Sequence, residues 1–259
     1  MTDIRYFVLT LLSLKAVESN MEGFVVGGIV PVITKFPHSV FLKVKCNEKN
    51  KEKTKYWSCG GSVLNQKIIL TAAHCMYGCD STSTFNVNMG HVNKDKGFSS
   101  MVRKHIIHKA FKINNASNDI GLAFIKGTIE FNSNIKRIAI VESPPYFEKS
   151  QIAGWGFIDE ITNKEDDFLR YIDQYVWKRD ACLKVLKQMP HGTICARSED
   201  EESYSSGGDS GSALVVRDYI QIGIVSYKDL TYSRSVVVYT DTGYFYNWIK
   251  ENARTLYCY

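Results

Sequence analysis

Several features that mark repetitive or multidomain proteins are missing from this sequence of 259 residues. It has only five prolines, no proline-rich linker, no low-complexity tract and no repeat of fixed period. These absences argue against a solenoid or a string of linked modules. With 44% hydrophobic residues, the chain suits one large or two small globular units with a full core.

The sequence also lacks a basic stripe interleaved with aromatic residues, the pattern expected of a nucleic-acid-binding surface. Its 32 basic and 27 acidic side chains leave a formal net charge of only +5. Much of that excess falls in Lys45–Lys55, KCNEKNKEKTK, which is typical of an exposed loop. We therefore expect no nucleic-acid partner.

No apolar run reaches 18 residues, so we expect no transmembrane segment and no membrane partner. The run Tyr6–Leu14 follows a short charged segment that ends at Arg5, and the small residues Val17 and Ser19 stand at signal-peptidase spacing. This pattern predicts a secretory signal over residues 1–19 and a secreted, extracellular protein. A buried N-terminal helix is the alternative interpretation.

The sequence offers only some of the ligands that a structural zinc site needs. Cys75 and Cys79 are four residues apart, with His74 adjacent, but no matching pair of ligands appears elsewhere. We expect no metal and no cofactor. In a secreted chain the seven cysteines are instead candidates for disulfides, and their odd number leaves at least one over.

Short runs rich in Val, Ile, Phe and Tyr recur between loops that contain Gly, Asn, Ser or Asp. This pattern predicts an all-β barrel or sandwich rather than βαβ units. The runs are Ser39–Val44, Lys67–Ala73, Ile120–Ile125, Ala213–Val216, Ile220–Tyr227 and Ser235–Thr240. Helical spacing of apolar residues predicts two helices, over Lys178–Met189 and, at the end of the chain, Gly243–Arg254.

Three short motifs carry candidate catalytic residues. Ser210 lies in SYSSGGDSGSAL, which alone is either a flexible polar turn or a loop that presents a nucleophile. A serine hydroxyl becomes a useful nucleophile only beside a base and near donors for the developing oxyanion. His74 ends an apolar, strand-like run in TAAHC, and Asp119 directly precedes another apolar run. Alone, such a histidine is more often structural and such an aspartate more often caps a strand.

Together, in the order His, Asp, Ser, the three motifs resemble those of the chymotrypsin-like (trypsin-fold) serine endopeptidases. The resemblance extends from Val25 to the final helix. It includes three further motifs: VVGG (Val25–Gly28), CGGSVL (Cys59–Leu64) and GWG (Gly154–Gly156).

The resemblance implies an all-β fold of two six-stranded antiparallel β-barrels with a C-terminal helix, over residues 25–259, with the active site in the cleft between the barrels. It implies that Ser210 attacks the scissile carbonyl, that His74 carries the proton, and that Asp119 orients the imidazole. The backbone amides of Gly208 and Ser210 would form the oxyanion hole, where a glycine lets the amide turn toward the substrate.

The resemblance also implies a zymogen. Residues 20–24 would be a short propeptide, and a cut after Phe24 would create an α-amino group on Val25 that pairs with Asp209. Most relatives carry Arg or Lys before this bond. Phe24 therefore implies an activating protease of chymotrypsin-like preference, or self-activation.

Three disulfides follow from the resemblance: Cys59–Cys75, Cys182–Cys195 and Cys46–Cys79. Cys258 is then free or bridged to another molecule. The family usually has a cysteine four residues before the nucleophile, and this position is Ser206. The bridge that joins two walls of the specificity pocket is therefore expected to be absent.

The expected specificity pocket departs from the family. Tyr204 occupies the base, where trypsin-like members carry Asp, so a neutral base argues against cleavage after Arg or Lys. One wall consists of Ser226, Tyr227 and Lys228, and Val237 lies on the opposite wall. Lys228 and Val237 replace usual glycines and should narrow the pocket, as in elastase-like members. An open apolar pocket and a closed pocket are the alternatives.

We thus expect a monomeric, secreted, non-tryptic serine endopeptidase of chymotrypsin- or elastase-like specificity, with protein or peptide substrates and possible protein inhibitors. The loop Gly90–Ser100 lacks paired glutamates, so we expect no calcium. Asn115 begins the only N-x-S/T sequon, NAS, and is either glycosylated at the rim of the cleft or unoccupied. The alternative function is that of a catalytically weak protease-fold protein that binds or regulates, to which the unusual pocket residues point.

Overall fold

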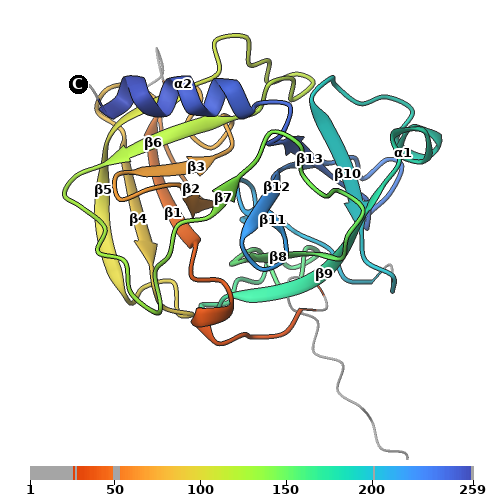
Figure 1. Cartoon of the computed structure of the whole chain (residues 1–259), viewed down its shortest axis with the longest axis horizontal. Helices are drawn as coiled ribbons and strands as arrows, with labels where there is room; N and C mark the ends of the chain where they lie inside the picture. The colour runs from red at the N-terminus through yellow and green to blue at the C-terminus, as the bar shows by residue number, and fades with distance from the viewer. Residues whose placement is uncertain (1–25, 27, 49–52, 201, 258–259) are drawn as a thin grey trace, which may run out of the picture.

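The structure is a computed structural model that describes residues 26, 28–48, 53–200 and 202–257. The expected signal over residues 1–19, the expected propeptide over 20–24, Val25 and Cys258 lie outside these described residues. Figure 1 shows two groups of strands side by side, with helix α2 lying across one of them.

Six antiparallel strands close the first barrel in the order β1-β2-β3-β6-β5-β4. They are β1 (Ser39–Asn47), β2 (Thr54–Val63), β3 (Ile68–Thr71), β4 (Thr84–Met89), β5 (Phe98–Ile107) and β6 (Gly121–Ile125). In β1, Val40, Leu42 and Val44 point into the barrel core, whereas Lys43 and Lys45 are exposed. This alternation follows from the two-residue repeat of a strand, which places successive side chains on opposite faces.

The second barrel consists of β8 (Ser150–Gly154), β9 (Arg170–Trp177), β10 (Thr193–Arg197), β11 (Ala213–Val216), β12 (Ile220–Lys228) and β13 (Val237–Asp241). They pair in the order β11-β8-β9-β10-β13-β12, and β11 pairs with β12 to close the barrel. The short strand β7 (Ala139–Ile140) adds to β12 in parallel. The expected all-β fold with two six-stranded antiparallel barrels is confirmed.

Two α-helices and a 3₁₀ helix, η1 (Ile33–Lys35), complete the described elements. Helix α1 (Arg179–Leu186) is shorter than the expected Lys178–Met189, because Lys187 takes a positive φ of 63° that ends it. Helix α2 (Tyr246–Tyr257) begins three residues later than expected. Residues 243–245 form a turn instead, because the side chain of Asp241 accepts hydrogen bonds from the amides of Gly243 and Tyr244.

Contacts between the barrels fix the cleft that carries the site. Helix α2 follows the second barrel in sequence, yet Ile249 and Leu256 join the core of the first barrel (Figure 1). A separate apolar cluster includes Phe41 from β1 and Trp155, which follows β8. Deep between the barrels, Ser62 Oγ of β2 donates a 2.6 Å hydrogen bond to Gln221 of β12. The two halves of the site are therefore held by a rigid frame.

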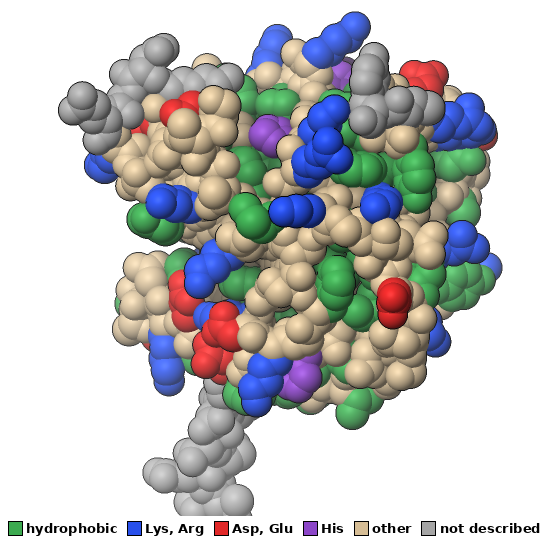
Figure 2. Space-filling view, turned by 90° about the vertical axis from the view of Figure 1, so that its left-hand side faces the viewer, with side chains coloured by type: hydrophobic (Ala, Val, Ile, Leu, Met, Phe, Trp, Pro, Cys, Tyr) green, Lys and Arg blue, Asp and Glu red, His purple; other side chains and the backbone are tan. Residues whose placement is uncertain are grey.

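Neither helix in the described part of the chain is both long and apolar enough to cross a membrane. On the face shown in Figure 2, Lys and Arg side chains are spread among neutral and apolar ones.

Candidate active site

His74 and Asp119 meet where two strands of the first barrel end. His74 follows β3, and Asp119 lies two residues before β6, which pairs with β3. Nδ1 of His74 lies 2.7 Å from Oδ2 of Asp119, and the backbone amide of His74 donates to Oδ1 at 2.9 Å. An ionised carboxylate only accepts hydrogen bonds, so Nδ1 carries the proton and Nε2 is left as the acceptor.

Strands of the second barrel hold the Asp119 carboxylate from the other side. Ser226 Oγ donates a 2.6 Å hydrogen bond to Oδ2 of Asp119, and Thr240 Oγ1 donates to its backbone carbonyl at 2.8 Å. The Asp119 side chain has no exposed surface, whereas that of His74 is 23% exposed. The carboxylate thus accepts three hydrogen bonds from two barrels, and part of the imidazole stays exposed.

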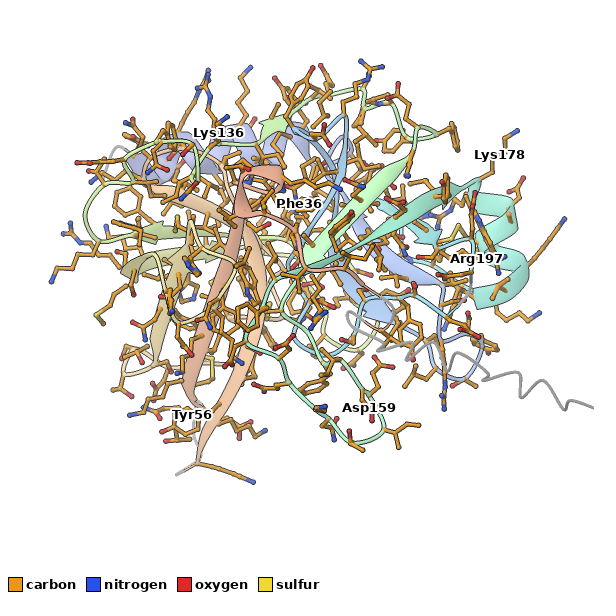
Figure 3. All side chains as sticks on the ribbon, turned by 90° about the horizontal axis from the view of Figure 1, so that it is seen from below. Phe36, Tyr56, Lys136, Asp159, Lys178 and Arg197 are labelled. Atoms are coloured by element: carbon orange, nitrogen blue, oxygen red, sulfur yellow. A yellow bond between two sulfur atoms is a disulfide. The ribbon has the colours of Figure 1, made fainter. Side chains whose placement is uncertain are left out.

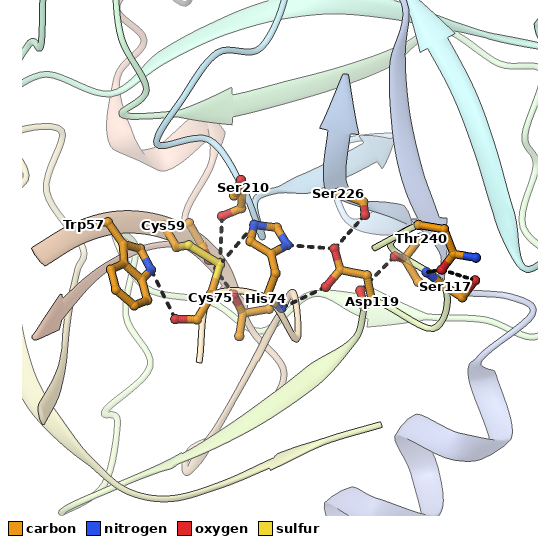
Figure 4. A network of polar contacts seen from close by, with 12 residues as sticks. Trp57, Cys59, His74, Cys75, Ser117, Asp119, Ser210, Ser226 and Thr240 are labelled. Carbon is orange, nitrogen blue, oxygen red and sulfur yellow. Dashed lines mark hydrogen bonds and ion pairs between the residues drawn. A yellow bond between two sulfur atoms is a disulfide. The ribbon is translucent and has the colours of Figure 1, made fainter. Parts of the chain in front are cut away.

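Ser210 lies on the loop that leads into β11, and Figure 4 shows the imidazole of His74 between Ser210 and Asp119. The amide of Gly60 donates a 2.7 Å hydrogen bond to the Ser210 carbonyl, which fixes this residue against the first barrel. No group within the described residues forms a hydrogen bond with Ser210 Oγ. This is common without substrate, since catalytic hydrogen bonds often shorten only when substrate binds.

Some amides of the loop before Ser210 donate no hydrogen bond. Asp209 N and Ser212 N donate within the loop, at 3.1 and 2.9 Å, but those of Gly208 and Ser210 donate to no atom of the described residues. Gly208 has a φ of +97°, and a Cβ there would lie 3.1 Å from the Cα of Gly156. Glycine is therefore required at this position, and the N–H groups of Gly208 and Ser210 remain free to bind an oxyanion.

The carboxylate of Asp209 is fully buried next to Ser210. It accepts 2.8 Å hydrogen bonds from the amides of Gly156 and Ser206. Burial raises its pKa to about 6, against the opposing effects of these hydrogen bonds and of the positive charge on Lys228. A Cβ on Gly154 or Gly156 would collide with this carboxylate, which explains both glycines of the GWG motif.

The expected pocket residues are brought together, but a cation lies among them. Lys228 Nζ is 4.1 Å from the centroid of the Tyr204 ring and 2.5 Å from Oε1 of Glu160. Val237 has no exposed surface and packs in the core of the second barrel, so it lines no open part of the pocket. Tyr227 is half-buried beside Lys228.

A groove of about 600 Å³ continues from Lys228 along the cleft. The loop that precedes Asp119 forms one side of it, and the segments around Met189 and Tyr227 form the other. Asn115 is exposed on this groove, with its side-chain oxygen bonded to Ser117.

Three disulfides join the pairs that the resemblance implied: Cys46–Cys79, Cys59–Cys75 and Cys182–Cys195. The sulfurs of Cys59 and Cys75 also lie close to the His74 ring. Because they are bonded to each other, they offer no thiolates for a metal. This bridge ties β2 to the segment that carries His74.

The sequence profile of the family described as Trypsin matches residues 25–249. The chain belongs to the trypsin family. It is accordingly a serine-type endopeptidase, a chymotrypsin-like hydrolase that acts on proteins. This agrees with the resemblance found from the motifs.

Relatives in the trypsin family cover most of the chain. Trypsin delta of Drosophila melanogaster is 27% identical over 241 residues, which is 90% of this chain and 90% of that protein. Chymotrypsin of Phaedon cochleariae is 29% identical over 247 residues, 92% of this chain and 84% of that protein. Hypodermin-B of Hypoderma lineatum is 29% identical over 245 residues, which is 91% of this chain and 90% of that protein.

Two solved structures show the same fold, each at 24% sequence identity. The HL collagenase structure has a TM-score of 0.75 and covers 87% of this chain and 97% of its own. The scabies mite inactivated protease paralogue S-D1 has a TM-score of 0.76, and the match covers 89% of this chain and 97% of that one.

Two features of this trypsin-family site are not evident from the sequence. Ser226 was expected only as a pocket wall, but its hydroxyl is bonded to Asp119, 107 positions earlier. Glu160 was not expected to have a role, because it lies in a charged loop segment, DEITNKEDD, that is typical of a solvated surface. The sequence signal for it was Lys228, a charged residue in an expected pocket wall, because a buried cation needs an acidic partner nearby.

Proposed function

We propose that this trypsin-family endopeptidase cleaves peptide bonds through His74, Asp119 and Ser210. The observation that carries the proposal is the pair of hydrogen bonds from His74 to the buried Asp119 carboxylate, beside a serine loop in which the amides of Gly208 and Ser210 are free. These groups supply a base, its orienting carboxylate and oxyanion donors, which are the parts that acyl transfer requires.

In the proposed reaction, Ser210 Oγ attacks the carbonyl carbon of the scissile bond while its proton passes to Nε2 of His74. The carbonyl electron pair becomes an oxyanion that the amides of Gly208 and Ser210 bind. Collapse of this intermediate breaks the C–N bond, and His74 donates its proton to the leaving amine. Water then attacks the acyl-enzyme by the same steps and releases the acid.

We also propose that the protein is secreted as a zymogen with non-tryptic specificity. A signal over residues 1–19 and three disulfides suit an extracellular protein. Burial raises the pKa of Asp209, and no cation among the described residues forms an ion pair with its carboxylate; the amino group of Val25 would supply one after a cut at Phe24. The hydrogen bond from Tyr204 N to the carbonyl of Val26 supports this, since it brings residue 26 to the serine loop. An activating protease and protein inhibitors remain part of the proposal.

One observation favours a second candidate function, that of a binding or regulatory protein with little turnover. Lys228 and Tyr204 contact each other at the place where the side chain of a substrate would enter. A pocket that is permanently filled would leave the catalytic groups intact but without substrate.

The test is covalent labelling with a fluorophosphonate, which reacts only with an activated serine. The full chain and a chain that begins at Val25 are treated in parallel, and Ser210→Ala is the control. We expect a stoichiometric adduct on Ser210 in the chain that begins at Val25 and far slower labelling of the full chain. A folded, correctly cut chain without an adduct would favour the binding function instead.

A further inference from the structure

Lys228 is a nearly buried cation at the end of strand β12. Its side chain is only 11% exposed, and burial lowers its pKa. Two contacts hold the ammonium group: the ion pair with Glu160 and the face of the Tyr204 ring. A cation in such a place needs an anion, because an unpaired buried charge is strongly destabilising.

The position of this cation relates it to the proposed reaction centre. Strand β12 also carries Ser226, whose hydroxyl is bonded to Asp119. Tyr204 precedes the serine loop by a few residues, and the charge of Lys228 is felt by Asp209, next to Ser210. Lys228 therefore faces the place where the side chain before the scissile bond would lie.

A phenol hydroxyl accompanies the ammonium group. The phenol of Tyr204, whose ring the ammonium contacts, forms no hydrogen bond with the described residues. Burial raises the pKa of this phenol, so it stays protonated and can donate to an acceptor that a ligand supplies. Ammonium and hydroxyl donors together suit a carboxylate.

Glu160 is placed so that a ligand can replace it. Its side chain is 22% exposed, and it lies on a small loop that the backbone closes between Asp159 and Lys164. Figure 3 shows Asp159 on the outer part of this loop, away from the strands. Glu160 can thus swing into solvent without breaking any strand pairing.

We propose that Lys228 selects substrates with an acidic side chain, Glu or Asp, before the scissile bond, and that Glu160 occupies this place in the free protein. The inference rests on the proposed catalytic function and names its substrate class. Replacing one carboxylate by another leaves Lys228 paired throughout. An apolar side chain would leave the ammonium without a partner, and a basic one would be repelled.

The experiment compares peptides that differ only in the residue before the scissile bond: Glu, Asp, Gln, Phe, Leu and Lys. The enzyme is the chain that begins at Val25, and fluorophosphonate labelling counts its working sites first. We expect kcat/KM for Glu or Asp to exceed that for Gln, which has the shape of Glu without its charge, by about tenfold or more. Lys228→Met should abolish this preference. Glu160→Gln should lower KM for the acidic peptides several-fold, since the internal competitor is lost.

Two results would overturn the proposal while leaving the catalytic function intact. In the first, a fully labelled enzyme cleaves after Phe or Leu best, and Lys228→Met leaves that order unchanged. In the second, the labelled wild-type enzyme cleaves none of the peptides, whereas Lys228→Gly cleaves after Phe or Leu. Lys228 would then block the pocket rather than select a substrate. Absence of labelling would instead refute the catalytic function itself, and this proposal with it.

Discussion

The buried carboxylate of Asp209 should give the uncut chain an unusual pH dependence of stability. Its pKa is raised to about 6, whereas an unfolded aspartate titrates near 3.8. Between these values the folded chain holds a proton that the unfolded chain has lost. Stability therefore falls as pH rises through this window, which is the reverse of the usual carboxylate behaviour.

The size of the effect follows from the shift. About two pKa units at about 1.4 kcal/mol each correspond to about 3 kcal/mol lost between pH 3 and pH 7. For a protein of this size that equals a change in Tm of about 6–12 °C. Asp209→Asn removes the titrating group, so the difference in unfolding free energy between variant and wild type should grow by this amount toward neutral pH.

The assay is urea unfolding of the full-length chain at a series of pH values, for wild type and Asp209→Asn. Asp80→Asn is the matched control, because hydrogen bonds to Thr82 lower the pKa of Asp80 and its contribution is lost as pH falls. A constant difference between Asp209→Asn and wild type from pH 3 to pH 7 would refute the reasoning. In the chain that begins at Val25, the same substitution should destabilise instead, because it removes the partner of the new amino group.

Three further outcomes test other parts of the site. Asp119→Asn should lower kcat by about 10⁴-fold, the loss typical of this substitution in a Ser-His-Asp triad, because an amide favours the wrong tautomer of His74. Peptide hydrolysis measures kcat, and a loss below tenfold would contradict the role assigned to Asp119. Ser226→Ala removes one of the three hydrogen bonds to the Asp119 carboxylate and should lower kcat about tenfold with little change in KM, whereas a change confined to KM would make Ser226 a wall residue only. Replacing Cys59 and Cys75 together by alanine opens a loop with a sequence separation of 16 and should reduce the unfolding free energy by about 3 kcal/mol in a urea titration.

The fold could be predicted from the sequence, as could the meeting of His74 and Asp119, because the signals for them are local. His74, Asp119 and Ser210 each stand in a short motif whose neighbours have structural reasons of their own. Gly208 has a positive φ that few other residues adopt. The glycines of GWG leave room for the Asp209 carboxylate. Such steric demands tie a particular residue type to a particular position in the sequence.

The remaining features depend on contacts between distant segments, which no local pattern encodes. The start of α2 was placed too early because apolar spacing continues through Gly243, whereas the side chain of Asp241 holds that segment in a turn. Val237 was expected in the pocket wall, but its side chain packs in the barrel core. The ion pair of Lys228 with Glu160 spans 68 positions and joins a strand to a loop that reads as solvated surface.

The absent pocket disulfide and the Lys228 ion pair bear on the same loop. Ser206, where the family usually has a cysteine, donates through Oγ to the carbonyl of Phe157, at the start of the loop that carries Glu160. Non-covalent links thus hold this loop against the pocket, and they include a 2.8 Å hydrogen bond from the amide of Phe157 to the carbonyl of Gly207. A disulfide typically stabilises by about 2–4 kcal/mol and does not exchange, whereas a single hydrogen bond contributes about 1 kcal/mol and re-forms readily. If Glu160 closes the pocket, a substrate can bind only when Glu160 leaves Lys228. A loop held by non-covalent contacts can make this movement, whereas a loop held by a disulfide is more constrained.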